Sequence, residues 1–155
     1  MVDAVDRKIL GLLAESARMT NAELADKLGM APSGALKRVR RLEEAGVIRR
    51  YETRVSEAAL GITTTTFVKV FTNERLGRNE VGKRLAELPE VQEVHYLAGN
   101  IDYLLKVRVR DTRGYMDFIR KLGAIEDVRT CESMVVLETV KETAALFLPE
   151  PDAAP

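Results

Sequence analysis

Apolar residues recur at helical spacing through the first 47 residues, and this pattern predicts three helices in quick succession. Asp3 is placed to cap the first helix, with the carboxylate of Asp6 in its first turn, and the pattern ends near Ser16. The second helix begins at a capping box, in which the hydroxyl of Thr20 and the carboxylate of Glu23 satisfy free backbone N–H groups.

The third helix is expected to be basic on its outer side. Gly29 suits the left-handed turn that ends the second helix, Pro32 suits the first position of the third, and Gly46 ends it. Two helices joined by so short a turn are typical of a helix-turn-helix. The residues expected on the buried stripe are Leu36, Val39 and Leu42. Those expected on the opposite side are Ser33, Gly34, Lys37, Arg38 and Arg41.

The spacing of apolar residues changes from helical to alternating after residue 61, which indicates β-strands. Residues 47–55, before this change, are interpreted as a short strand or an extended hinge. The order of elements that follows is strand, helix, strand, strand, helix, strand, which is the ferredoxin-like arrangement. The strands are expected at 63–72, 91–97, 103–109 and 128–140, and the helices at 78–88 and 112–122.

The predicted fold is therefore α+β, with a winged-type helix-turn-helix followed by a ferredoxin-like βαββαβ domain. The last residues are rich in proline and alanine and are expected to be partly disordered. The predicted divisions are a helix-turn-helix domain at 1–47, a hinge strand or linker at 48–61, a ferredoxin-like domain at 62–142, and a C-terminal extension at 143–155.

The composition indicates a globular protein with a buried core and few candidate sites for catalysis or metal binding. Apolar residues make up 46% of the chain and charged residues 31%, as in proteins that bury a core. No apolar run approaches the roughly 18 residues that span a bilayer, and the start lacks a secretory signal, so a cytoplasmic protein is expected. Cys131 has no second cysteine to pair with. No metal-ligand spacing or glycine-rich phosphate loop is present, so no cofactor is expected.

Charge is balanced overall but not locally. The chain has 24 Lys and Arg against 24 Asp and Glu. Residues 37–54 hold seven Lys and Arg against three Asp and Glu, and such a patch attracts a phosphate backbone. A charged helix can also simply solvate an exposed face, but the short turn and flanking helices favour DNA. Arg49, Arg50 and Arg54 are weaker candidates, for phosphate contacts or for keeping the hinge soluble.

The N-terminal residues of such a helix meet base edges in the major groove. Ser33, Gly34, Lys37 and Arg38 are assigned to the groove, and Arg41 to a phosphate. Arg38 is the first choice for a guanine contact, because its planar fork can bond O6 and N7 together. One helix buries too little surface to discriminate against bulk DNA, so binding as at least a dimer, to a pseudo-palindromic duplex, is expected.

Three phrases together resemble the Lrp/AsnC family of transcriptional regulators: D-x-x-D-x-x-I-L at 3–10, R-V-R-R-L-E-E-A-G-V-I at 38–48 and G-N-I-D-Y-L-L-K at 99–106. The resemblance extends over residues 2–142. It implies that the first part binds DNA, and that the second part pairs subunits, assembles dimers into octamers or other rings, and binds small effectors, usually amino acids. Ala31 departs from the family's capping Ser or Thr, a loss of about 1 kcal/mol, for which Ser33 is expected to compensate in part.

The loop at 98–103 is the second candidate site. Its glycine allows close backbone approach and its polar side chains offer acceptors for an amino acid, although the same residues also suit an ordinary hairpin turn, which the sequence alone favours. The resemblance instead implies an effector site between dimers. The implied residues are Gly99, Asn100, Asp102 and Tyr103, with Thr130, Glu132 and Ser133 from a neighbouring subunit. Asp102 or Glu132 would receive the effector's ammonium group, an acidic pair would favour a basic ligand, and an effector-free regulator stays open.

Two other functions fit parts of the sequence. An enzyme is disfavoured, because the single histidine, His95 with Glu93 two residues away, is more typical of a packed or surface residue than of a general base. An architectural protein that compacts DNA with little sequence choice would use the same helices. The uncovered face of the predicted sheet, which includes residues 63–71, is expected to pair two subunits.

Overall fold

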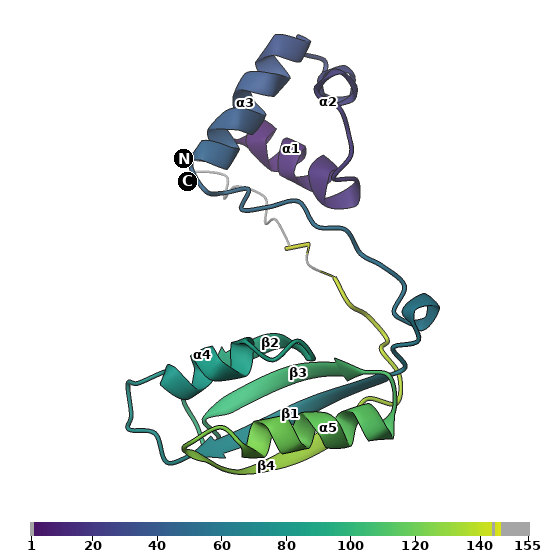
Figure 1. Ribbon diagram of the computed structural model, residues 1–155. Coiled ribbons are helices and arrows are strands. Elements are labelled where there is room, and N and C mark those ends of the chain that lie inside the picture. Colours follow the sequence, from purple (N-terminus) through teal and green to yellow (C-terminus); the bar gives the residue numbers. More distant parts are fainter. Residues whose placement is uncertain (1, 144, 147–155) are drawn as a thin grey trace. The chain divides into compact units, whose positions relative to one another are not determined.

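The computed structural model describes residues 2–143 and 145–146, which form two compact units (Figure 1). The first unit contains residues 2–54 together with 141–143 and 145–146, and the second contains residues 55–140. Residue 144 and residues 147–155, which make up most of the predicted C-terminal extension, lie outside the described residues. Within the described residues, no helix is both long enough and apolar enough to cross a membrane.

The first unit is built of three helices that start at the predicted caps. Helix α1 is Ala4–Glu15, α2 is Asn21–Leu28 and α3 is Pro32–Glu44. Asp3 Oδ1 accepts a hydrogen bond from the N–H of Asp6 at 2.8 Å, and Thr20 Oγ1 accepts one from the N–H of Glu23 at 3.2 Å. Both predicted capping interactions are confirmed, so the start of each of these helices is set by local sequence.

The core of the first unit differs from the expected one at a single position of α3. Its buried side chains are Ile9, Leu24, Ala25, Ala35, Val39 and Leu42. Val39 and Leu42 were expected there, but the third buried residue of α3 is Ala35, and Leu36 is only partly buried. Residues 35, 39 and 42 follow one narrow stripe, whereas residue 36 lies on its edge.

The start of α3 lacks a side-chain cap. Ala31 occupies the N-cap position with an extended backbone, and no side chain bonds to the free N–H groups there. The expectation that Ser33 would compensate is wrong, because Ser33 already lies inside the first helical turn, past the position from which a cap acts. The N–H of Gly34 donates instead to Ala31 O at 2.9 Å, and the first turn of α3 has no side-chain acceptor.

Residues 47–55, predicted as either a short strand or an extended hinge, form the extended hinge. Gly46 adopts a left-handed conformation with φ 67°, and the N–H groups of Val47 and Ile48 both donate to Leu42 O. No described residue of the first unit forms a strand, so the short strand is absent. Further along, Arg54 Nη1 donates to Glu142 O at 2.8 Å, which ties residues 141–143 to this unit.

The second unit is the expected four-stranded antiparallel sheet with two helices. Its elements are a short 3₁₀ helix at Ala58–Leu60, then β1 Thr64–Thr72, α4 Glu80–Ala86, β2 Val91–Tyr96, β3 Tyr103–Val109, α5 Thr112–Gly123 and β4 Val128–Val135. The strand order is β2-β3-β1-β4. The prediction that the last strand reaches residue 140 is wrong. It ends at Val135, opposite Thr66, and the N–H of Val136 still donates to Thr65 O at 2.9 Å. Because β1 starts at Thr64, the antiparallel register leaves residues 138–140 without a partner on that strand.

Helices α4 and α5 cover the same face of this sheet (Figure 1). Side chains of both helices join one core cluster with alternate residues of β1 and β3. Its buried members are Val68, Val70, Val81, Leu85, Tyr103, Leu105, Val107, Val109, Phe118 and Leu122. The opposite face carries no helix, and we call it the open sheet face. By strand register its residues include Phe67, Lys69, Phe71, Leu104, Lys106, Glu132 and Met134.

Candidate nucleic-acid interface and effector site

One side of α3 faces solvent along its whole length. At about 100° per residue, positions 33, 37, 40 and 44 lie opposite the buried residues of the helix. All four side chains are exposed, and we call Ser33, Lys37, Arg40 and Glu44 the outer face of α3. An open hollow of about 720 Å³ adjoins this face and is lined by its four residues and also by Arg38 and Arg41. The hydroxyl and the two cations of the face are donors suited to base edges and phosphates, and Glu44 adds a carboxylate at its C-terminal end.

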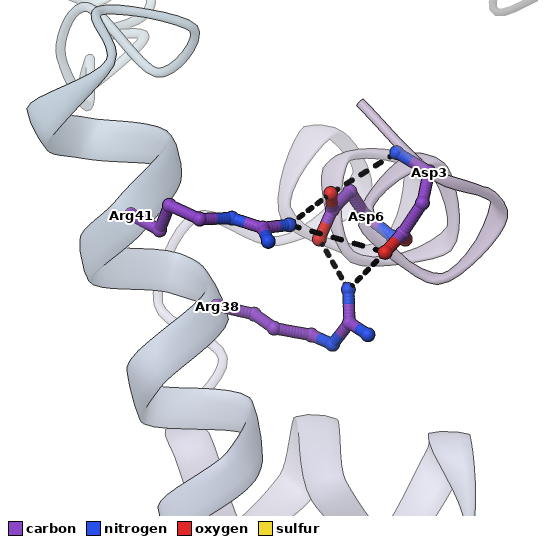
Figure 2. A network of polar contacts seen from close by, with 4 residues as sticks. All are labelled: Asp3, Asp6, Arg38 and Arg41. Carbon is purple, nitrogen blue, oxygen red and sulfur yellow. Dashed lines mark hydrogen bonds and ion pairs between the residues drawn. The ribbon is translucent and has the colours of Figure 1, made fainter. Parts of the chain in front are cut away.

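Arg38 and Arg41 lie on the flank of α3, and Figure 2 shows both guanidinium groups directed at two carboxylates near the start of α1. Arg38 Nη1 donates to Asp3 Oδ2 at 2.5 Å and to Asp6 Oδ1 at 2.8 Å. Arg41 Nη2 donates to Asp6 Oδ2 and lies 3.9 Å from Asp3 Oδ2. We call these four side chains the acid–arginine network.

The capping box of α1 holds the two acids in place. Asp6 Oδ2 accepts the N–H of Asp3 at 3.1 Å while Asp3 caps the helix, and the side chain of Asp6 is fully buried. The hydrogen bond from Arg38, followed by that from the N–H of Asp6, lowers the pKa of Asp3 from 3.8 to about 2. The same acids raise the pKa of Arg38, with the hydrogen bond to Asp3 contributing most.

The five residues assigned to DNA from the sequence thus occupy different environments. Ser33 and Lys37 are exposed on the outer face of α3, as expected, and Gly34 is partly buried. Arg38 and Arg41 were expected as free cations on that side, but the structure pairs them with α1. This difference arises from partners about 35 residues away in the chain, which helical periodicity cannot reveal. DNA contact by each of the five stays a prediction.

Arg40 is an outer-face cation that was not assigned from the sequence. Its side chain is exposed, and among the residues that the structure describes no carboxylate forms an ion pair with Arg40 or Lys37. The signal that could have identified it is the spacing of four, three and four residues between positions 33, 37, 40 and 44, which traces one helical stripe. Of the weaker candidates, Arg50 pairs with Glu52 at 2.5 Å.

The loop between β2 and β3 is anchored through Asp102. The N–H of Leu97 donates to Asp102 O at 2.9 Å, and Asp102 Oδ2 accepts the N–H of Thr72 at 2.6 Å. No hydrogen bond from a described residue reaches Asp102 Oδ1. Gly99 and Asn100 are exposed, and a Cβ added to Gly99 would meet no atom within 4 Å. The chain itself does not require glycine at 99, which leaves room for a ligand there.

Tyr103 points away from this loop and into the core. Its side chain is 1% exposed, and its hydroxyl donates to Glu74 Oε2 at 2.7 Å. Burial, followed by the hydrogen bond to Glu74, raises the pKa of Tyr103 above its ordinary value. Glu74 Oε1 meanwhile accepts the N–H groups of Glu80 and Val81, which begin α4. The phenol therefore helps to hold α4 on the sheet.

The three candidate effector residues of β4 are separated from the loop at 98–102. Strand β1 lies between β3 and β4, so a single chain does not gather all seven residues. Thr130 and Glu132 lie on the open sheet face, where Glu132 Oε2 is 3.2 Å from Lys69 Nζ. Ser133 lies on the helix-covered face, where its hydroxyl is hydrogen-bonded to that of Tyr115. A contribution of β4 from a neighbouring subunit stays a prediction.

A second hollow, lined by polar residues, lies beside the chain segment that joins β1 to α4, and no sequence pattern predicted it. Its volume is about 440 Å³, and its lining combines two arginines with acidic side chains. The lining residues are Asn73, Glu74, Arg75, Arg78, Glu80 and Asp127. Within the described part of the chain, no group of three or more His, Cys, Asp or Glu side chains is arranged to hold a metal ion.

Both units match known protein families. A family described as winged helix-turn-helix DNA-binding matches residues 2–49, and the Lrp/AsnC ligand binding domain matches residues 65–146. The matched ranges correspond to the helical unit and to the sheet unit. They confirm the predicted order of a helix-turn-helix followed by a βαββαβ domain, and they match a family of regulators rather than enzymes.

Individual relatives match along almost the whole chain. The proline dehydrogenase transcriptional activator of Rhodobacter capsulatus is 37% identical over 92% of this chain and 94% of its own. The leucine-responsive regulatory protein of Escherichia coli K12 is 34% identical over 95% and 92%. A transcriptional regulator of Neisseria meningitidis in complex with L-Met superposes with a TM-score of 0.88 at 30% identity, covering 94% of this chain and 96% of that one. The chain therefore belongs to the Lrp/AsnC family of transcriptional regulators.

Proposed function

We propose that this regulator binds particular sequences of double-stranded DNA through the outer face of α3, and that an amino acid bound to the second unit changes its DNA affinity or its assembly. The observation that carries the proposal is that one supported helix presents the exposed cations Lys37 and Arg40 beside the hydroxyl of Ser33, and that neither cation has a carboxylate partner in the part of the chain that the structure describes. The family assignment gives that helix its recognition role.

The geometry of α3 suits the major groove. The groove is about 12 Å wide and admits an α-helix with its side chains. In this orientation the N-terminal residues, Ser33, Gly34 and Lys37, approach base edges, while Arg40 lies one turn further along and approaches the backbone. One helix of this size discriminates poorly, so a homodimer that presents two copies of α3 to two half-sites is the binding species.

The effector is an α-amino acid. The relative from Neisseria meningitidis was solved with L-Met, and the relative from Escherichia coli is described as leucine-responsive. An amino acid needs an acceptor for its ammonium group and N–H donors for its carboxylate. Asp102 Oδ1 supplies the first, and the exposed backbone at Gly99 and Asn100 supplies the second. Tyr103 follows this loop with its side chain in the core, and Thr130, Glu132 and Ser133 come from a neighbouring subunit.

Assembly uses the open sheet face. Phe67, Phe71, Leu104 and Met134 place apolar surface there, and each is only partly buried or exposed in the single chain. An apolar face of this kind is stabilised when a second sheet covers it. The homodimer formed in this way assembles further, to an octamer, which brings the loop at 98–102 of one dimer to β4 of the next.

Selection of bound duplexes from a random-sequence library tests the DNA part. The expected result is enrichment of a pseudo-palindromic sequence, with discrete protected stretches in a footprint of the enriched duplex. Uniform protection without enrichment would contradict the proposal and would favour an architectural, DNA-compacting role.

A thermal-shift screen of the twenty amino acids, repeated with the enriched duplex present, tests the effector part. A ligand at 100 times its Kd stabilises the folded state by about 2.7 kcal/mol. The expected result is that one or a few amino acids raise the unfolding temperature of the second unit and change the affinity for the duplex. The duplex should then change the affinity for the amino acid by the same factor. No shift with any of the twenty, with or without DNA, would contradict it.

A further inference from the structure

The four basic residues in the middle of α3 fall into two classes. Lys37 and Arg40 lie on the outer face of α3 and have no carboxylate partner among the described residues. Arg38 and Arg41 instead lie on the flank that faces α1, and each donates to the buried carboxylate of Asp6 (Figure 2). The sequence had grouped Lys37 with Arg38 and Arg41 and had left Arg40 unassigned.

The carboxylate of Asp6 holds the second class in place. Its side chain is fully buried, and its two oxygens accept from Arg38, from Arg41 and from the N–H of Asp3. A buried carboxylate is tolerated when it is hydrogen-bonded and its charge is matched. If either arginine moved away to bind a phosphate, the buried carboxylate of Asp6 would lose one of its two cationic partners. Because an unmatched buried charge is costly, the arginines favour their bonds to Asp6 over a phosphate contact.

The spacing of the network matches on both helices. Asp3 and Asp6 are three residues apart at the start of α1, and Arg38 and Arg41 are three residues apart on α3. Residues three apart lie on the same side of a helix, so two carboxylates face two guanidinium groups. The opposed charges cancel at close range, and the network adds little to the field that attracts a phosphate backbone.

We infer that Asp3, Asp6, Arg38 and Arg41 are positioning residues that fix α3 on α1, and that Lys37 and Arg40 are the cations of α3 that contact DNA. This inference rests on the proposed function and refines its DNA-reading surface. It reassigns Arg38, which the sequence singled out for guanine, to the orientation of the helix. It adds Arg40, which the sequence did not assign.

The salt dependence of DNA binding separates the two classes. The full chain and its K37Q, R40Q, R38Q and R41Q variants are titrated with a 30-base-pair duplex enriched by the unaltered protein, over a range of salt concentrations. Each lost phosphate contact lowers the slope of log K against log salt by about 0.9. We expect this reduction in R40Q, because Arg40 approaches the phosphate backbone. K37Q, which loses a contact to base edges, is expected to lose affinity for the enriched duplex relative to a scrambled duplex. Both variants should keep the unfolding temperature of the unaltered protein.

The network variants are expected to behave differently. R38Q and R41Q keep the slope of the unaltered protein, lose affinity by the same factor at every salt concentration, and unfold at a lower temperature. A slope reduced by about 0.9 in R38Q or R41Q, at an unchanged unfolding temperature, would overturn the assignment. Unchanged affinity and slope in both K37Q and R40Q would also overturn it.

The D6N variant tests whether Asp6 orients α3 or only holds Arg38 and Arg41 away from DNA. If Asp6 only held the arginines back from DNA, D6N would release them and increase both the affinity and the salt slope, which would overturn the inference. As a positioning residue, Asp6 is expected to matter for specificity. The specificity ratio is the affinity for the enriched duplex divided by the affinity for a scrambled duplex of the same composition. We expect this ratio to be at least tenfold lower in D6N than in the unaltered protein.

These outcomes are distinguishable from failure of the proposed function. If the unaltered protein enriches no sequence from the library, the proposed function and the inference fall together. If it enriches a sequence and the four glutamine variants then show the opposite pattern of slopes, only the assignment of residues within α3 falls.

Discussion

The two candidate sites differ in how much of each is present in one chain. The outer face of α3 is complete, because its residues follow one stripe of one helix that α1 and α2 support. The candidate effector residues are divided between the loop at 98–102 and β4, with β1 between them. The proposed DNA-reading face therefore depends only on contacts inside the chain, whereas the proposed effector site requires residues of a neighbouring subunit.

Within the second unit, Gly82 lies in the core and Gly99 lies in the proposed effector loop. Substitution of Gly82 is expected to have the largest effect on stability of the changes considered. A Cβ at Gly82 would lie 2.7 Å from the ring of Tyr103, and one at Gly99 would meet nothing within 4 Å. We expect Gly82→Ala to destabilise the second unit by about 1–3 kcal/mol through overpacking, and the matched control Gly99→Ala to leave its stability unchanged, both measured by denaturant unfolding. A loss of amino-acid response in Gly99→Ala at unchanged stability would place the ligand against this backbone.

Tyr103→Phe tests whether this phenol acts in packing or in ligand binding. The substitution removes the donor to Glu74 Oε2, and we expect it to reduce the free energy of unfolding by about 1–2 kcal/mol. The response of the unfolding temperature to a bound amino acid should keep its size, because the hydroxyl points into the core. An intact stability combined with a lost response would instead assign the hydroxyl to the ligand.

The first unit offers a gain of stability at the start of α3. Ala31 stands at the N-cap with a suitable extended backbone and no side-chain acceptor. Ala31→Ser is expected to stabilise the first unit by about 1 kcal/mol, because the hydroxyl can accept a free N–H of the first turn. Ala17→Ser, outside any cap position, is the control and should change little. Destabilisation by Ala31→Ser would mean that its backbone cannot adopt the capping geometry.

The smallest expected effect is on pH dependence. The pKa of Asp3 is lowered from 3.8 to about 2, so its ion pair stabilises the folded state fully above pH 3.8 and is lost as the pH falls toward 2. The unfolding temperature of the first unit should therefore fall as the pH is lowered from 3.8 to about 2. In D3N, which lacks this titrating carboxylate, the unfolding temperature should fall less over the same range. Equal declines in both proteins would remove Asp3 as a contributor.

Local signals explain what the sequence could predict of the fold. The caps at Asp3 and Thr20 and the left-handed glycines at 29 and 46 act within a few residues, and they placed the three helices correctly. The end of β4 was not predictable, because it depends on where β1 starts more than 60 residues earlier. Strand length here is set by the partner and not by the residues of the strand itself.

The residues of the two candidate sites were likewise predictable only where local sequence determines their environment. The exposure of Ser33 and Lys37 follows from helical periodicity, but the pairing of Arg38 with Asp3 spans 35 residues and depends on how α1 packs against α3. Tyr103 was predicted to begin the strand at 103–109, and the resemblance implied a place in the effector site; the alternation of that strand directs its side chain into the core. Tertiary partners, which periodicity does not encode, decide which charged and polar side chains remain available.

The most direct test of the account repeats the selection from a random-sequence duplex library with a Ser33→Ala, Lys37→Gln variant in place of the unaltered chain. If the outer face of α3 reads base edges, the variant should enrich a sequence with altered or relaxed preference at the positions next to these residues in each half-site, while its unfolding temperature stays the same. Enrichment of the same sequence with the same affinity by both proteins would contradict the claim that this face recognises DNA.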